Sequence, residues 1–441
     1  MKPTLVFAVL LTAAGVESQT DSLDTQRDWP QWRGPYGTGV AAIGNPPASW
    51  SESENVAWKT EIPGLGSATP IVWGDRLYLL TAIQAAAAEP RRVPDPDPRG
   101  AHADVVPSTH VYRFTLLALS RADGRILWQK VLREQQPHDA VHKFGTFASA
   151  SPFTDGERLY AYFGSNGLYA TDMEGNLLWQ KDLGDLMKRR GFGEGSTPVL
   201  HGDKIIVLWD HEGQSFIAAL DKHTGEELWR TERDEISSWT SPFVIEHESG
   251  AQVVTSATNR VRSYDFETGQ LLWESSGVSL NAIPTPVGSD GMVFVTSGFR
   301  DFVLRAVDLA KARGDITGSD AIVWSQDRDT PYVPSPLLYN DTLYLLKSNS
   351  GILSAIDAKT GNNHYLERLE GVMNVFASPV AGGGRIYVTS REGATAVVEG
   401  GEEFRLIAVN ELEDGFDASP AIVDDEIYLR GKRYLYRISA Q

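Results

Sequence analysis

The chain has 441 residues, 41% of them apolar, and carries a formal net charge of −18. An acidic surface of this kind opposes binding to phosphate backbones and anionic membranes, and no Lys/Arg stripe with interleaved aromatic residues is present, so we predict no nucleic-acid binding. The absence of cysteine excludes disulfides, a lipid-modified N-terminal cysteine, covalently attached c-type haem and a thiol nucleophile.

Residues 1–18 have the features of an export signal. Lys2 supplies a charged start, residues 4–15 are apolar, and residues 16–18 ("VES") provide a small-residue cleavage context. A buried strand or a membrane anchor are the alternatives, but the run is too short to span a membrane comfortably. We expect an exported chain, periplasmic or secreted, whose mature form has no transmembrane segment.

Residues 19–54 form a leader before the regular part of the chain. Its stretch "DWPQWRGPYGTGVAAIGNPPASW" contains three tryptophans and is rich in Gly and Pro, which interrupt helices and strands. We therefore expect an irregular segment here.

From residue 55 onward the chain repeats one unit roughly every 40 residues. A small residue followed by proline opens each unit, at Pro70, Pro152, Pro198, Pro242, Pro286, Pro336, Pro379 and Pro420. Each proline begins an apolar strand, and a Gly/Asp turn and a second strand with period-two alternation follow.

The second half of each unit is equally regular. A third strand often ends in Asp, a short turn follows, and a fourth strand ends on an aromatic residue, at Trp128, Trp179, Trp229, Trp273, Trp324 and, in weaker form, Tyr365. Four strands per unit, repeated at this period, are typical of β-propeller blades. We expect each terminal aromatic residue to pack between neighbouring blades.

The sequence thus predicts an all-β, eight-bladed β-propeller of four-stranded antiparallel blades over residues 55–441. The last blade, from Asp417, contains three strands, and the isolated segment 55–62 ("NVAWKTEI") contains one. We expect this N-terminal strand to complete the last blade and close the ring, because closure removes an exposed sheet edge. The leader is then expected to lie across the outside of the ring.

Two insertions break the period. Residues 82–111 are Pro-rich and polar, and they are predicted to form an extended loop between the second and third strands of the first blade. Residues 309–320 lengthen the turn before Trp324.

The units resemble the repeat of the pyrroloquinoline quinone (PQQ) enzymes. "AALDKHTGEELW" (218–229) and "YDFETGQLLW" (264–273) match that pattern well, and "AIDAKTGNN" (355–363) matches in part. The chain, over roughly residues 50 to 440, is also similar to exported bacterial PQQ-like propeller repeat proteins, which share the leader motif "WPQWRGPYGTG". Both groups are related in fold to quinoprotein alcohol dehydrogenases and to the β-barrel assembly scaffold lipoprotein.

If the chain is an enzyme, this resemblance implies that it is a quinone-dependent dehydrogenase with PQQ and calcium as cofactors. Those enzymes place a disulfide of adjacent cysteines against the quinone, which this chain cannot form, and their metal ligands and catalytic Asp match no motif here. The scaffold lipoprotein has a similar length and eight blades, but it is anchored through a lipidated cysteine that is missing here. The catalytic and cofactor-binding residues therefore remain unassigned.

Loops after the second and fourth strands of a four-stranded blade emerge on one face of the ring. We expect a pocket at this channel mouth, formed from His138, His142, Glu194, Asp210, His211, Glu212, Glu235, Trp239, Asn281, Tyr332, Arg391 and Arg430. Carboxylates with an imidazole can hold a divalent cation, so Glu194, Asp210 and Glu212 are candidate metal ligands. Solvated or turn-capping residues, or a protein-binding face, are the alternatives.

Three functions are compatible with this sequence. The first is a monomeric binding or scaffold module in the cell envelope, with a protein or envelope component as partner. The second is a PQQ- or metal-dependent oxidoreductase with its site at the channel mouth. The third, a polymer-active enzyme, requires two facing carboxylates, for which Glu194 with Asp210 or Glu212 are the candidate pairs.

Overall fold

The computed structural model describes residues 27–93, 97, 99–100 and 102–440. The predicted export signal, residues 1–18, lies outside the described residues. None of the helical segments in the described part of the chain has the length and hydropathy needed to cross a membrane.

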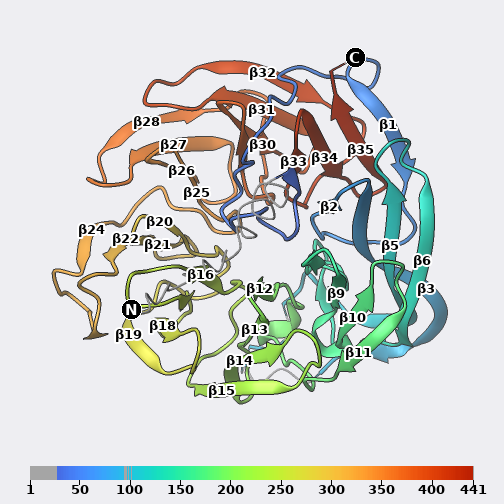
Figure 1. Cartoon of the computed structure of the whole chain (residues 1–441), viewed down its shortest axis with the longest axis horizontal. Coiled ribbons are helices and arrows are strands. Elements are labelled where there is room, and N and C mark those ends of the chain that lie inside the picture. Colours follow the sequence, from blue (N-terminus) through green and yellow to red (C-terminus); the bar gives the residue numbers. More distant parts are fainter. Residues whose placement is uncertain (1–26, 94–96, 98, 101, 441) are drawn as a thin grey trace, which may run out of the picture.

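Eight antiparallel sheets are arranged like the blades of a propeller around a central channel (Figure 1), which confirms the predicted fold class. Blades 1 and 2 consist of β2 (Ile71–Trp73), β3 (Arg76–Arg91), β5 (Ser108–Ser120) and β6 (Ile126–Gln135), then β8 (Phe153–Thr154), β9 (Arg158–Tyr162), β10 (Leu168–Asp172) and β11 (Leu177–Lys181). Blades 3 and 4 consist of β12 (Val199–His201), β13 (Lys204–Trp209), β14 (Ser215–Asp221) and β15 (Glu227–Arg233), then β16 (Phe243–Ile245), β17 (Gln252–Thr255), β18 (Arg260–Asp265) and β19 (Leu271–Ser276).

The other half of the ring repeats this order. Blades 5 and 6 consist of β20 (Val287–Ser289), β21 (Met292–Ser297), β22 (Val303–Asp308) and β24 (Ile322–Gln326), then β25 (Leu337–Tyr339), β26 (Thr342–Leu346), β27 (Ile352–Asp357) and β28 (Asn363–Arg368). Blades 7 and 8 consist of β29 (Val380–Gly382), β30 (Arg385–Thr389), β31 (Ala394–Glu399) and β32 (Leu406–Glu411), then β33 (Ala421–Val423), β34 (Glu426–Arg430), β35 (Tyr434–Ser439) and β1 (Val56–Glu61). Two short 3-10 turns, η2 (Gly164–Asn166) and η3 (Arg189–Gly191), lie in the connecting loops.

The position of a strand within its blade explains its sequence. Strand β13 is buried over "IIVLW" because both faces of its blade pack against neighbouring blades, whereas the outer strand β15 alternates between exposed and partly covered residues. The core therefore lies between blades; one cluster joins Tyr160 and Ala170 of blade 2 to Val207 of blade 3.

The N-terminal strand closes the ring as predicted. β1 pairs antiparallel with β35, with Thr60 opposite Leu435 and Trp58 opposite Arg437. Figure 1 shows the blue β1 beside the dark red β35. The first and last strands of the propeller thus hold blade 8 together.

The aromatic residues of the fourth strands lie between blades, as expected. The Trp179 indole donates a hydrogen bond to the Lys222 carbonyl of the next blade (3.1 Å), and Trp229 donates in the same way to Phe266 (3.1 Å). The glycine of the next turn lies under the ring: a Cβ on Gly225 would come within 2.7 Å of Trp179. The glycine of each Thr-Gly turn thus packs under the tryptophan of the preceding blade, which explains why both residues recur with the period of the repeat.

A chain of hydrogen bonds connects the blades at the inner strands. The Ser or Thr before each first-strand proline donates its backbone N–H to the hydroxyl of the equivalent residue in the next blade. The seven bonds, 2.9 to 3.2 Å long, run through Thr69, Ser151, Thr197, Ser241, Thr285, Ser335, Ser378 and Ser419. The eighth bond, at the junction of the last and first blades, is missing, and the Thr69 hydroxyl is buried without a partner.

The leader departs from the prediction. It does not lie across the outside of the ring but crosses the channel at the inner strands: Trp29 bridges Val72 of blade 1, and Val40 bridges Ala381 of blade 7. The buried Arg33 donates to the carbonyls of Pro336 and Pro379 (3.1 and 2.9 Å). The inner strands offer carbonyls that the blades leave unpaired, and the leader supplies their donor.

Both insertions contain strands where loops were expected. Strands β3 and β5 extend into residues 82–111, with Ile83 opposite Arg113 and Arg91 opposite Ser108, so much of this insertion is a hairpin. Its β4 (Val105–Val106) pairs with β7 (Val141–His142), in the loop before blade 2. In the second insertion, β23 (Gly314–Asp315) adds a fifth strand to blade 4.

Candidate functional site

A cavity of about 560 Å³ lies at the channel mouth. It is lined by loops that follow second or fourth strands, the arrangement expected from the blade geometry. Five of the predicted pocket residues line it: His142, Glu194, Trp239, Asn281 and Tyr332. At its inner end it reaches Trp32 of the leader and hydroxyl-bearing residues of the inner strands, including Thr197, Ser335 and Ser378.

Aromatic side chains form much of the wall of this cavity. Tyr332 stacks on Phe299, with ring centroids 4.8 Å apart, and Trp239 lies beside Phe192 at 6.2 Å. The Trp239 indole donates to the Gly193 carbonyl (2.7 Å), which fixes the ring. The predicted pocket did not include the phenylalanines of the wall, because a single apolar residue in a loop carries no chemical signal. They are Phe144, Phe192, Phe299 and Phe376.

Arginines give the mouth a local positive charge in an acidic protein. Arg190 donates to the Gly100 carbonyl (3.1 Å), and the Arg300 guanidinium lies over the Phe299 ring at 5.3 Å. Within the described residues, neither arginine has a carboxylate at ion-pair distance. Two cations without a carboxylate partner among the described residues, one of them over an aromatic ring, suit an anionic group on a binding partner.

Arg391 lies directly beneath the aromatic wall. Its guanidinium lies over the rings of Phe144 (4.1 Å) and Phe376 (4.4 Å), and it forms an ion pair with Asp417, which lines the cavity. Arg391 thus supports two phenylalanines of the wall.

Arg430, by contrast, is buried in blade 8. None of its guanidinium nitrogens has a hydrogen-bond partner, and burial lowers the pKa of Arg430 to about 10. Asn281 is also buried with its Oδ1 unpaired, but it lines the cavity.

Asp210 belongs to a buried ion pair within blade 3, formed with Arg233 at the end of β15. Its carboxylate accepts two bonds from the Arg233 guanidinium (2.7 and 3.1 Å) and one from the Ser238 hydroxyl (2.7 Å). The side chains of Asp210 and Arg233 are fully buried, and the aspartate raises the pKa of Arg233. This carboxylate is held by protein donors, and its partner Arg233 donates to the hydroxyls of Thr255 and Tyr264 in blade 4 (3.0 and 2.6 Å).

Glu235 lies in the same buried network. Its carboxylate accepts hydrogen bonds from the backbone N–H groups of Asn259 and Arg260 and from the Arg262 guanidinium, all at 2.9 Å. Burial raises the pKa of Glu235 to about 7, although Arg233 acts in the opposite direction. Glu235 is therefore a carboxyl group that titrates near neutral pH without lining the cavity.

His211 and Glu212 also point into the protein rather than to the mouth. The His211 ring accepts from the Met187 N–H (3.1 Å) and donates to the Gln214 carbonyl (3.1 Å), and Glu212 accepts from the Ser237 N–H (3.2 Å). Each of these side chains fixes a loop of blades 2 to 4.

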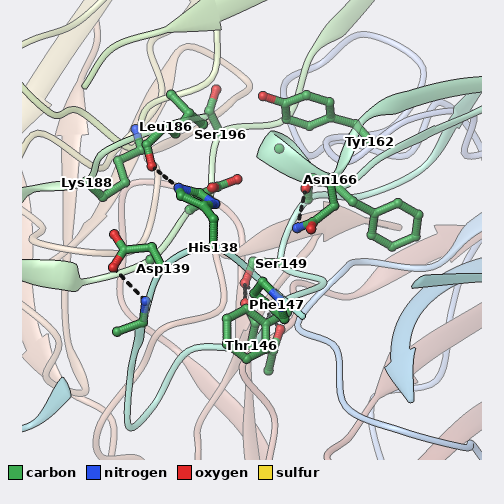
Figure 2. Close-up of a pocket in the computed structure, with 18 of the residues that line it drawn as sticks. His138, Asp139, Thr146, Phe147, Ser149, Tyr162, Asn166, Leu186, Lys188 and Ser196 are labelled. Atoms are coloured by element: carbon green, nitrogen blue, oxygen red, sulfur yellow. Dashed lines mark hydrogen bonds between the residues drawn. The ribbon is translucent and has the colours of Figure 1, made fainter. Parts of the chain in front are cut away.

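A second, small cavity of about 40 Å³ lies behind Glu194, between blades 2 and 3. Figure 2 shows His138 directed toward Leu186, whose carbonyl accepts its Nε2–H at 2.8 Å. Glu194 accepts from the Ser165 N–H (2.9 Å) and hydroxyl (2.6 Å), and burial raises the pKa of Glu194. Lys188, on the same cavity, has its pKa lowered to about 8 by burial.

The predicted metal ligands Glu194, Asp210 and Glu212 are each bonded to different protein donors. In the described part of the chain, one group of acidic and histidine residues lies close enough together to share an ion. It consists of His102, Asp104 and His142. Two of these come from the 82–111 insertion, for which the sequence predicted an extended loop but no ligand residue.

Comparison with known families gives one match over most of the chain. A family model described as outer membrane protein assembly factor BamB matches residues 40–208 and 212–441. Two curated relatives are described by the same words. The protein of Yersinia pestis is 23% identical over 340 residues, which cover 71% of this chain and 77% of that protein. The protein of Francisella salina is 24% identical over 172 residues, which cover 38% of this chain and 30% of that protein.

Two solved structures share the fold. BamB from Moraxella catarrhalis superposes with a TM-score of 0.54 at 15% identity, covering 81% of this chain and 99% of that one. A europium-containing methanol dehydrogenase superposes with a TM-score of 0.60 at 11% identity, covering 94% and 91%. At these identities the two likenesses concern the fold alone.

The residues at the mouth do not fit the calcium and quinone of the dehydrogenases. Calcium takes six to eight oxygen ligands, but Glu194 and Asp210 are bonded to separate protein donors. The chain also lacks the cysteines for the disulfide that those enzymes place against the quinone.

Proposed function

The chain belongs to the family described as outer membrane protein assembly factor BamB, and on this premise we propose that it is a scaffold which binds a protein partner at the channel mouth. We propose further that the partner takes part in outer membrane protein assembly, as the names of the relatives suggest. Export to the periplasm, directed by residues 1–18, and a monomeric state are parts of this proposal.

The observation that carries the proposal is the aromatic cavity with Arg190 and Arg300, for which the described part of the chain supplies no carboxylate partner. Aromatic residues and arginines dominate the binding energy of protein interfaces, especially where they surround a pocket. The hydroxyl bonds, the closing strand and the leader hold the blades beneath these loops, so the mouth is presented by a rigid support. The expected partner segment is a loop with acidic and aromatic side chains.

Charge reversal at the mouth tests this proposal. We expect the double variant Arg190→Glu/Arg300→Glu to lose its envelope partner in affinity capture from cells. Arg125→Glu is the matched control, because Arg125 lies in the turn between β5 and β6, on the opposite face, and its side chain is 74% exposed. Equal partner yields from both variants would contradict a mouth-directed interface.

A titration with PQQ and Ca²⁺ tests the alternative oxidoreductase function. Absorbance and melting temperature would follow binding to the mature chain. We expect neither to change in a saturable, stoichiometric way. Stoichiometric binding would favour the oxidoreductase over the scaffold and would justify a dye-linked screen of alcohols and sugars.

A further inference from the structure

Two neighbouring loops bring three side chains of metal-ligating type together at the mouth. His102 and Asp104 lie in the insertion of blade 1, and His142 lies in the loop that leads to blade 2. Their ligand atoms are all within 4.8 Å of one another, and all three residues line the large cavity. The pairing of β4 with β7, which places Val105 opposite His142, holds the two segments in register.

From this geometry we propose that His102, Asp104 and His142 bind a divalent transition-metal ion, with zinc as the expected species. Zinc is held in proteins by imidazole nitrogens and carboxylate oxygens at about 2.0–2.2 Å. In a tetrahedral site such ligand atoms are separated by roughly 3.4 Å. Shortening the distances between these ligand atoms by up to about 1.4 Å therefore suffices to form the site.

Each side chain has a ligand atom available. The Asp104 Oδ1 accepts from Lys143 Nζ (2.9 Å), whereas Oδ2 is directed toward His102, at 4.0 Å from its Nδ1. The Nδ1 atoms of His102 and His142 accept long contacts from the backbone N–H groups of Asp104 and Phe144, both at 3.2 Å. These two Nδ1 atoms are thus unprotonated, and the ion has only weak hydrogen bonds to replace.

The surroundings select the kind of metal. Lys143 beside Asp104 repels any cation, so a site that depended on charge alone, as calcium sites do, is disfavoured. Imidazole ligands favour zinc, nickel and copper over calcium and magnesium. Packing of Phe192 against both imidazoles, at centroid distances of 5.4 and 5.8 Å, limits their rotation.

The site has two consequences for the mouth. The ion would join the insertion of blade 1 to the loop before blade 2, and so fix one wall of the cavity. Three protein ligands leave a fourth tetrahedral position, which is taken by water or by an oxygen or nitrogen of a bound molecule. The proposal does not rest on the scaffold function, since it concerns only residues of this chain.

Calorimetry with zinc chloride on the chelator-treated mature chain is the direct test. We expect saturable binding of one ion per chain, weakened at least about tenfold by His102→Ala or His142→Ala. Asp104→Asn is expected to weaken binding as well, whereas Lys143→Met is expected to strengthen it by removing the repulsion. The matched control is His223→Ala, because His223 lies in an exposed turn on blade 3 outside the cluster.

Two further measurements separate metal binding from folding. Melting temperatures without metal are expected to be equal for the parent, His142→Ala and His223→Ala, and zinc is expected to raise them only for the parent and His223→Ala. Cobalt in place of zinc should give visible absorption bands typical of a four-coordinate site in the parent. Absence of zinc binding, or binding unchanged in a His102→Ala/His142→Ala variant, would overturn the proposal.

Discussion

At the inner strands, equivalent Ser and Thr residues of successive blades make the same hydrogen bond seven times, whereas the loops at the mouth contribute side chains of several kinds, among them His142, Trp239 and Arg300. The first region is built from the repeat, and the second from departures from it. Residues that recur with the period therefore stabilise the ring. The candidate sites arise from residues that the period does not explain, such as His102, Phe299 and Arg300.

Asp210 is an exception to this division, because it does not recur with the period and yet stabilises the fold through a buried ion pair. Asp210→Ala leaves the Arg233 guanidinium buried without its carboxylate, and we expect a loss of about 3–5 kcal/mol in the free energy of unfolding. Denaturant unfolding measures this loss. Asp320→Ala is the control, because the Asp320 side chain is 88% exposed, and its expected change is below about 0.5 kcal/mol. Similar losses in both variants would contradict the assignment.

The same network predicts a pH dependence. The pKa of Glu235 is about 7 in the folded chain and lies above its unfolded value, so the folded state binds the proton more tightly. Stability from this group is present below about pH 4.5 and is lost as the pH rises to about 7, by up to roughly 3 kcal/mol. Thermal unfolding across this range should show the slope in the parent and a flatter profile in Glu235→Gln; parallel profiles would refute the shift.

A repeated glycine tests the packing between blades. Gly225 has φ +72° and lies under Trp179, so Gly225→Ala combines backbone strain with a clash, at a cost of about 2 kcal/mol. Gly202 has φ +53° but open space around its Cα, and Gly202→Ala carries the strain alone, about 1 kcal/mol. Equal melting temperatures for the two variants would mean that the tryptophan contact contributes nothing.

The chain of hydrogen bonds between the inner Ser and Thr residues offers two variants for which different changes in the free energy of unfolding are expected. Ser151→Ala removes the acceptor of the Thr69 N–H and should lower the free energy of unfolding by about 1 kcal/mol. Thr69→Val removes a buried hydroxyl that has no partner and should be neutral or stabilising. Chemical denaturation of both variants checks this, and a destabilised Thr69→Val would show that the junction of blades 8 and 1 is closed by another contact.

The smallest effect on stability is expected at the mouth itself. Arg300 has no carboxylate partner among the described residues, so Arg300→Glu should change the free energy of unfolding by less than about 0.5 kcal/mol. Its effect should appear in partner capture instead. A large loss of stability would mean that Arg300 stabilises the propeller fold and is not a residue of the proposed binding site alone.

The repeat made the fold accessible from the sequence. The prolines, the Thr-Gly turns and the tryptophans are local signals that recur, so eight blades and the closing strand could be predicted. The leader could not be placed, because its contacts, such as Arg33 with Pro379, join residues hundreds of positions apart. Nor could the hairpin within 82–111 be recognised, since its pairing outweighs the polar composition of the segment.

For the candidate site, sequence reasoning identified the face but only part of the residues. The order of strands in a blade places the loops, and this sufficed for His142, Glu194 and Trp239. The strand order did not reveal that Asp210 pairs with Arg233 of its own blade and Glu235 with Arg262 of the next, because the partner of a carboxylate is set by tertiary packing. The phenylalanine wall and His102 likewise depend on which loops meet.

Site-specific photo-crosslinking in cells tests most directly whether the mouth is the binding face. A photoreactive residue would replace Phe299 at the mouth or, as control, Glu157, whose side chain is 77% exposed in the turn between β8 and β9 on the opposite face. We predict a reproducible crosslink to a protein of outer membrane assembly from position 299 and none from 157. Crosslinks from 157 alone, or from neither position, would contradict the account.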